Sequence, residues 1–164
     1  MRDNLILIGM PGSGKSTLGQ RVAKILDFSF IDLDDEIVKM ANMPIPEIFS
    51  RFGEAGFRQL ERKAVLKLEG VSRTVIGTGG GIVLDPENVA LLRRVGFVCL
   101  IDRPLEELAV GGDRPLSTTQ EAVAKLYRER RALYERAADA AVSNTRNICP
   151  DLAAEKIVEA YREN

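Results

Sequence analysis

The chain of 164 residues is long enough for one globular domain with a sizeable core, and its 45% apolar and 29% charged residues are ordinary for such a domain. A net charge of −1 leaves no surplus of basic residues to neutralise phosphates, which argues against broad nucleic-acid binding. The chain has no histidine and two isolated cysteines, Cys99 and Cys149, which excludes Cys/His zinc sites and nucleophiles activated by histidine.

The first apolar segment is the short run Leu5–Ile8, which follows a polar start. Four apolar residues are too few for a signal peptide or a membrane span, so we expect a cytoplasmic protein. The run is short, apolar and followed by a glycine, which is typical of a buried strand.

The segment Gly9–Ser16 fits the pattern G-x-x-x-x-G-K-[ST] at every fixed position, between this strand and a helical pattern over residues 17–26. Backbone N–H groups of such a loop surround phosphates, and the helix N-terminus adds its positive dipole end. Lys15 is expected to reach the β- and γ-phosphates, and Ser16 to ligate Mg²⁺. The predicted nucleotide ligands are Gly12, Ser13, Gly14, Lys15, Ser16 and Thr17.

A second strand, Phe28–Ile31, ends in a group of carboxylates. Asp32 and Asp34 are two residues apart and therefore face the same side at the carboxyl end of a strand, where α/β sheets bind ligands. The alternative is that Asp34 or Asp35 caps the following helix. We expect Asp35 to be the cap, and Asp32 and Asp34 to belong to a site.

Pro44 and Pro46 interrupt the helical pattern and restart it, with Pro46 near a first helical position. Gly53 breaks the pattern again, and a long helix is expected over residues 54–68. One face of it is apolar and carries Phe57, Leu60, Ala64 and Leu68. Arg58 lies between Glu54 and Glu61 at spacings that meet on a helix surface. Taken alone, this pattern indicates a solvated ion pair.

A third strand, Thr74–Ile76, runs into Gly77-Thr78-Gly79-Gly80-Gly81. Consecutive glycines are costly in chain entropy, so another group must come close to this backbone. A flexible loop fits poorly, because the apolar run Ile82–Leu84 follows at once and Asp85-Pro86 begins another helix.

A fourth strand is predicted at Phe97–Ile101, and a helix from Asp102 through Leu108. The polar segment 111–120 follows, with a glycine pair at its base. Such a segment suits a mobile lid, with the glycines as hinge. A plain surface loop is the competing interpretation.

The next helix, about residues 121–138, carries Arg130 on an apolar stripe with Leu126, Leu133 and Ala137. Arginine is rarely buried without a partner or ligand, so Arg130 is a site candidate. Arg128, Arg131 and Arg136 fit the solvated side of the helix.

A fifth strand at Ala140–Ser143 and a last helix from Pro150 complete the pattern. About five strands that alternate with helices predict an α/β fold: a five-stranded parallel sheet with helices on both faces and right-handed crossovers.

The chain resembles the shikimate kinase family along nearly its whole length. The matching residues are the loop Gly9–Ser16, Asp32-x-Asp34, Phe57-Arg58-x-x-Glu61, Gly79-Gly80-Gly81, Arg114-Pro115-Leu116 and Arg130-x-x-Leu133-Tyr134. The phosphate loop alone would indicate only a nucleotide, whereas the later motifs together are much more specific.

The resemblance implies ATP-dependent phosphorylation of the 3-hydroxyl of shikimate, with Mg²⁺. It also implies a P-loop fold like that of nucleoside-monophosphate kinases: one kinase domain over residues 1–164, with a lid at about 111–120 and substrate-binding helices at about 34–61. We expect a monomer whose partners are ATP, ADP and shikimate.

The residues that the resemblance places on shikimate are Asp34, Arg58, Gly79, Gly80, Gly81 and Arg130. The family's pattern puts Asp32 on Mg²⁺ through water and closes Arg114 over the phosphates. The catalytic residues would be Lys15, Asp34 and Arg114. Guanidinium groups suit the substrate's carboxylate, and an acidic acceptor suits its hydroxyls.

The sequence departs from the family's pattern at four positions. Ala132 replaces the usual proline, Ser117 replaces the usual leucine, and Ala109-Val110 lack the arginine that commonly stacks on adenine. Arg146 is the only basic residue in the other loop that usually contributes to the adenine site.

Two other functions are compatible with the phosphate loop. A kinase of gluconate or another hydroxy acid would lack the combined set Asp34, Arg58, Gly79–Gly81 and Arg130, which this chain has. A regulatory nucleotide-binding module would typically be fused to another domain or have lost catalytic residues.

Overall fold

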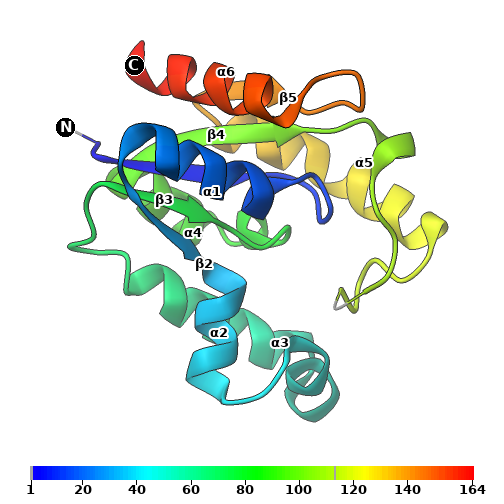
Figure 1. Ribbon diagram of the computed structural model, residues 1–164. Helices are drawn as coiled ribbons and strands as arrows, with labels where there is room; N and C mark the ends of the chain where they lie inside the picture. Colours follow the sequence, from blue (N-terminus) through cyan, green and yellow to red (C-terminus); the bar gives the residue numbers. More distant parts are fainter. Residues whose placement is uncertain (1, 113) are drawn as a thin grey trace.

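The computed structural model describes residues 2–112 and 114–164, and its centre is a parallel sheet with the strand order β2-β3-β1-β4-β5 (Figure 1). The strands are β1 (Asn4–Ile8), β2 (Ser29–Asp32), β3 (Thr74–Gly77), β4 (Gly96–Asp102) and β5 (Ala140–Ser143). The helices are α1 (Lys15–Leu26), α2 (Leu33–Ala41), α3 (Ile45–Leu66), α4 (Pro86–Val95), α5 (Gln120–Ala137) and α6 (Pro150–Arg162). The predicted five-stranded parallel α/β fold is confirmed. No helix in these residue ranges is long and apolar enough to cross a membrane.

The sheet lies between two apolar layers, and β1 contributes to both. Leu5 and Leu7 pack in the cluster that contains residues of α1 and α6. Ile6 and Ile8 pack on the other side, with residues of α2, α3, α4 and α5. Successive side chains of a strand point to opposite faces, so a central parallel strand must be apolar at every position.

The start of α2 differs from the prediction, because Asp32 and not Asp35 is the capping residue. The Asp32 carboxylate accepts a hydrogen bond from the Asp34 N–H at 2.9 Å, and the helix begins at Leu33. β2 extends through Asp32, which pairs with Gly77 of β3, so the strand passes directly into the helix without a loop. Asp35 lies exposed in the first turn, where its charge favours the helix dipole.

One expected helical boundary is confirmed and one expected helix is corrected. Helix α3 begins at Ile45, next to the predicted restart at Pro46, and is kinked at the predicted break, Gly53, with φ 68° and ψ −176°. The helix expected from Asp102 through Leu108 is a single 3₁₀ turn, η2 (Leu105–Glu107). After η2 the chain is extended and reaches the phosphate loop, where a Cβ on Gly12 would lie 3.1 Å from the Ala109 nitrogen.

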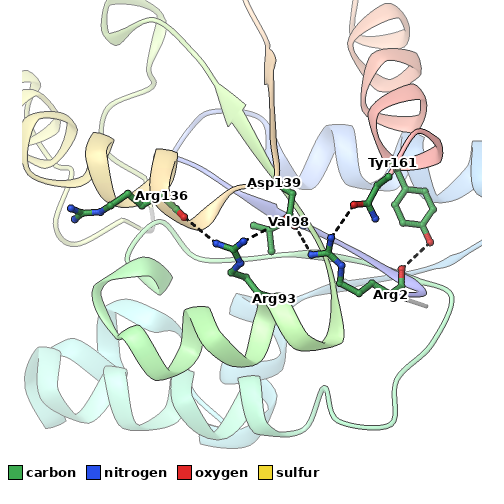
Figure 2. Close-up of polar contacts among 7 residues, drawn as sticks. Arg2, Arg93, Val98, Arg136, Asp139 and Tyr161 are labelled. Carbon is green, nitrogen blue, oxygen red and sulfur yellow. Dashed lines mark hydrogen bonds and ion pairs between the residues drawn. The ribbon is translucent and has the colours of Figure 1, made fainter.

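A polar network joins the two ends of the described chain to β4 and α4 (Figure 2). The Asp139 carboxylate accepts hydrogen bonds from the Arg2 guanidinium at 2.8 Å and the Val98 N–H at 2.9 Å, and it pairs with Arg93 at 3.5 Å. Arg2 also donates to the Asn164 side chain at 2.9 Å. Arg2 precedes β1 and Asp139 precedes β5, so the network lies at the amino ends of these strands.

Candidate functional site

The residues that directly follow β1, β2 and β3 line one cavity of about 330 Å³. Carboxyl ends of parallel strands meet at one edge of a sheet, and the order β3-β1-β4 places the point at which the strand order reverses beside the phosphate loop. Helices α2, α3 and α5 and the segment before α5 supply the other lining residues. Figure 1 shows where these elements lie in the fold.

The phosphate loop is fixed from the side of the sheet that carries β5. Asn144, which follows β5, donates its side-chain amide to the Ser13 carbonyl at 2.7 Å. Gly14 has φ 98°, and a Cβ there would come within 2.5 Å of the Asn144 amide. A side chain at position 14 is therefore excluded by both conformation and space.

Lys15 points back onto the loop that carries it. Its ammonium donates to the carbonyls of Gly9 and Met10, both at 2.8 Å. Burial lowers the pKa of Lys15 to about 8, although the nearby carboxylates of Asp34 and Asp32 act in the opposite direction. The loop thus holds a compact cation that can exchange carbonyl partners for phosphate oxygens.

Ser16 and Asp32 form a pair of oxygen donors at the edge of the cavity. The Ser16 hydroxyl donates to the second carboxylate oxygen of Asp32 at 2.5 Å. Hydroxyl and carboxylate oxygens are the ligands that Mg²⁺ takes, and Mg²⁺ in nucleotide sites uses few protein ligands beside phosphates and water. The donor set therefore fits a hard divalent cation, although no cluster of three or more acidic, His or Cys ligands exists in the described residues.

Asp34 carries a buried carboxylate oxygen, Oδ1, for which the described residues provide no hydrogen-bond partner. Burial raises the pKa of Asp34 from 3.8 to about 6, with a further rise from Asp32 and a counteracting effect of Lys15. A buried acceptor without a donor is costly, so this atom is suited to a donor from a ligand.

Arg58 is held by two glutamates of its own helix. Its guanidinium donates to Glu61 at 2.9 Å and to Glu54 at 3.2 Å, while its Nε has no partner in the described residues. Glu61 is only 2% exposed, and burial raises its pKa against the effect of Arg58. The expected solvated ion pair is therefore largely a buried one, at the wall of the cavity.

Arg130 of α5 is 3% exposed and lines the same cavity. Its burial agrees with its position on the apolar stripe. Arg128, Arg131 and Arg136 are exposed, as expected for the solvated side of α5.

The segment before α5 is closed on itself by backbone hydrogen bonds. The Gly111 N–H donates to the Ser117 carbonyl at 2.8 Å, and the Ser117 N–H donates to the Arg114 carbonyl at 3.0 Å. Arg114 is exposed and lines the cavity, and Ser117 is 1% exposed at its wall. Asp113, inside the expected lid, lies outside the described residues.

The cavity brings together the predicted phosphate-loop, metal and acceptor residues. The predicted residues that line it are Gly12, Gly14, Lys15, Ser16, Thr17, Asp32, Asp34, Arg58, Gly79, Gly80, Gly81, Arg114 and Arg130. Ser13 and Arg146 are not among the described residues of its lining. Ser13 is buried. Arg146 is exposed, and its backbone N–H donates a hydrogen bond to the Glu107 carboxylate at 2.8 Å.

Sequence reasoning had not placed Glu61, Tyr134 or Asn144 at the site. Glu61 follows Phe57 by four residues and precedes Ala64 by three, so it lies on the same apolar stripe. That signal, which singled out Arg130, would have found Glu61. Asn144 follows the fifth strand at the ligand-binding edge of the sheet, but nothing in its neighbours distinguishes it from an ordinary loop residue.

Comparison with known proteins assigns the chain to a family. A family model described as shikimate kinase matches residues 11–162. The shikimate kinase of Thermoanaerobacter pseudethanolicus is 40% identical over 96% of this chain and 95% of its own length. That of Clostridium beijerinckii is 42% identical over 90% of this chain and 89% of its own length. The chain belongs to the shikimate kinase family.

Solved structures of the family agree with this assignment. The shikimate kinase from Acinetobacter baumannii in complex with shikimate matches with a TM-score of 0.92 at 30% identity, over 99% of this chain and 94% of that one. The shikimate kinase from Aquifex aeolicus matches with a TM-score of 0.83 at 32% identity. The predicted P-loop kinase fold and the predicted enzyme class, an ATP-dependent shikimate kinase, are confirmed.

Proposed function

We propose that this chain transfers the γ-phosphoryl group of ATP to the 3-hydroxyl of shikimate within the cavity described above. The observation that carries the proposal is the position of the partnerless Asp34 carboxylate oxygen in the same cavity as the phosphate loop. A hydroxyl donor on that oxygen would face a phosphoryl group held by the loop. Phosphoryl transfer depends mainly on positioning and charge neutralisation, so the lack of histidine is no obstacle.

Asp34 is proposed to orient the attacking hydroxyl and to take its proton. With a pKa of about 6, its carboxylate is mostly ionised at neutral pH and remains more basic than an exposed aspartate. Arg58 and Arg130 are proposed to bind the substrate's carboxylate, and Gly79–Gly81 to approach its ring through their backbone. Both arginines lie at the cavity wall, and the Arg58 Nε has no acceptor in the described residues.

On the nucleotide side, Lys15 is proposed to leave the Gly9 and Met10 carbonyls for the phosphates, while Arg114 adds a second positive charge. Ser16 and Asp32 would hold Mg²⁺, which when bound neutralises the phosphate charge. Arg146 is proposed to contribute to the adenine site, although its side chain lies outside the cavity.

The segment 111–120 is proposed to act as a lid over both substrates, with Gly111 and Gly112 as its hinge. Helices α2 and α3 would then form the acceptor-binding part of a single kinase domain. A monomeric state and a cytoplasmic location stay predictions, and gel filtration with light scattering tests the first.

The reaction is tested by steady-state ADP release with ATP and Mg²⁺, comparing shikimate, gluconate and no acceptor. We expect turnover with shikimate alone. Preference for gluconate would replace the acceptor assignment. Equal ADP release in all three reactions would indicate an ATPase, and no release in any of them would indicate a non-catalytic module.

The role of Lys15 is tested by Lys15→Ala, with Lys24→Ala as the matched control on the exposed side of the same helix. The first variant should lose turnover by a factor of about 10² or more, since it removes a charge that stabilises the transition state. The second should keep it. Wild-type turnover in Lys15→Ala would end the phosphate-loop assignment.

A further inference from the structure

Tyr134 is a buried polar side chain that the reaction has not so far used. It lies on α5 one turn after Arg130, and 2% of it is exposed. Its hydroxyl donates to the Gly80 carbonyl at 2.5 Å and lies 3.7 Å from the Met10 sulfur. Burial raises the pKa of Tyr134 to about 12, so the phenol stays protonated and able to donate at any working pH.

The glycine segment that Tyr134 contacts is tightly enclosed by the site. A Cβ on Gly80 would lie 2.5 Å from the Pro11 ring, and one on Gly81 would lie 2.3 Å from the Arg58 guanidinium. A Cβ on Gly79 would lie 3.0 Å from the partnerless oxygen of Asp34. The backbone of this segment therefore touches both the phosphate loop and the acceptor residues, and it has no side chains of its own to hold it.

The hydrogen bonds of the segment are unevenly distributed. The Gly79 and Gly81 carbonyls accept from the N–H groups of Ile82 and Leu84, at 3.2 and 3.1 Å. The Gly80 carbonyl accepts from Tyr134. By contrast, the N–H groups of Gly80 and Gly81 donate to no acceptor in the described residues. Gly81 is buried and Gly80 is half-buried. A buried N–H group without an acceptor is rare in folded proteins, so that of Gly81 in particular is suited to a ligand that brings acceptor oxygens.

We propose that Tyr134 is a positioning residue for the acceptor substrate, which it serves by fixing the orientation of the peptide between Gly80 and Gly81. A trans peptide is planar, so its N–H points opposite to its C=O. Holding the Gly80 carbonyl against α5 therefore fixes the direction of the Gly81 N–H, within a segment that lines the cavity. The bond also connects this orientation to the helix that carries Arg130, so one rigid element places two groups for one ligand.

The inference rests on the proposed function, because the ligand it concerns is shikimate, the acceptor in the proposed reaction. Tyr134→Phe removes the hydroxyl and retains the ring that fills the core. Without this bond the Gly80–Gly81 peptide can turn, and the preorganised N–H is lost. We expect shikimate to bind about three- to tenfold more weakly in calorimetry without nucleotide, as for the loss of one hydrogen bond. Binding of a non-hydrolysable ATP analogue with Mg²⁺ should stay within twofold of the wild type.

Tyr127→Phe is the matched control, since Tyr127 lies on the same helix and its hydroxyl contacts the exposed Arg131 outside this cavity. It should bind both ligands like the wild type. Unchanged shikimate affinity in Tyr134→Phe would overturn the inference, and so would a proportional loss of both ligands, which indicates general damage to the fold. Failure of the wild type itself to bind shikimate would instead overturn the proposed function.

A measurement on the wild type keeps the inference testable if Tyr134→Phe does not fold. With ¹⁵N-glycine labelling, the Gly81 amide should shift and become protected from hydrogen exchange when shikimate is added. The amides of Gly70 and Gly96, outside the cavity, should not change. A Gly81 amide that is insensitive to shikimate would contradict the proposal.

Discussion

Asp34 and Lys15 are two ionisable groups whose burial moves their pKa values toward each other. Burial favours the neutral form of each, which raises the pKa of the acid to about 6 and lowers that of the base to about 8. The interval in which both are charged is therefore narrow and centred on neutral pH. Asp34 must be ionised to accept a proton, and Lys15 must be protonated to neutralise phosphate.

The pH dependence of kcat/KM should accordingly be bell-shaped. Activity is expected to rise with pH through about 6 as Asp34 loses its proton, and to fall through about 8 as Lys15 loses its own. The profile is measured with both shikimate and Mg²⁺-ATP subsaturating, so that it reports the pKa values of the ligand-free protein. A profile that is flat between pH 5 and 7 would contradict the role of Asp34 as the base.

The same burial predicts how stability depends on pH. The pKa of Asp34 is higher in the folded chain than its ordinary value of 3.8, so the folded state binds the proton more tightly than the unfolded state. The stability that this group contributes is therefore present below about pH 4 and lost as the pH rises through about 6. Asp34→Asn should raise the melting temperature at pH 7.5 while removing turnover, and the gain should vanish near pH 4.

Asp32 accepts two hydrogen bonds that belong to different parts of the site. One carboxylate oxygen binds the Ser16 hydroxyl, and the other caps α2 at the Asp34 N–H. Asp32→Asn keeps an oxygen for the cap but loses the charge. We expect it to bind shikimate normally in the presence of a chelator and to bind Mg²⁺-ATP more weakly.

Asp32→Ala should weaken shikimate binding even with chelator, and should destabilise the fold by about 1 kcal/mol, as for loss of an N-cap. Ser16→Ala is the control, because it removes the Ser16 contact and leaves the cap. Normal shikimate affinity in Asp32→Ala would show that the cap does not position Asp34.

At the scale of helices and strands, the spacing of apolar residues along the sequence predicted most of the fold. The five strands were located to within two residues at each end, because each is a short apolar run between glycine or polar residues. The start of α2 was predicted wrongly because a strand that passes straight into a helix leaves no loop residue as a signal. The 3₁₀ turn η2 was predicted as a helix because Leu105 and Leu108 have helical spacing. The chain ends the turn there because Ala109 lies against Gly12 of the phosphate loop.

Comparing the sequence pattern with the structure also explains which site residues were predicted and which were missed. Arg130 was found because a charged residue on an apolar stripe needs a partner or a ligand. Glu61 has the same signature on α3 but reads as half of an ordinary ion pair with Arg58. Tyr134 gave no signal of its own, because a buried tyrosine fits any apolar stripe. Its partner is a backbone carbonyl more than fifty residues away, which no local pattern encodes.

The segment 111–120 should respond to ligands as one element. Its closed hydrogen-bonded loop rests on Gly111 and Gly112, both at positive φ and with open space around them. We expect amide hydrogen exchange in this segment to slow when shikimate and an ATP analogue bind together. The α6 helix is the internal control, since it packs on the opposite face of the sheet. Equal exchange in the free and liganded protein would favour the plain-loop interpretation.

For the whole molecule, the Asp139 network is expected to support stability and not turnover (Figure 2). The Asp139 side chain is 14% exposed; it pairs with two arginines and accepts a hydrogen bond from the Val98 N–H. Asp139→Ala leaves the Val98 N–H without its acceptor, and should reduce the free energy of unfolding by about 2 kcal/mol. Its kcat should stay near that of the wild type.

Glu69→Ala is the comparison variant, because Glu69 pairs with Arg94 while 55% of its side chain is exposed. Its loss should be about 0.5 kcal/mol or less, as for exposed ion pairs. Urea denaturation at neutral pH measures the free energy of unfolding of both variants. Equal losses for the two variants would show that burial of the Asp139 network adds nothing.

The pairing of β1 determines how the chain must assemble. Leu5 pairs with Val75 and Asn4 pairs with Gly96, so the central strand acquires its two neighbours only after long loops have closed. Folding should therefore be slower than in a helical bundle of this size, since contacts of large sequence separation form late. During synthesis β1 emerges before β3 and β4 and has no partner until they follow. Until then Leu5–Ile8 is an unpaired apolar strand, and such a strand exposes the nascent chain to aggregation.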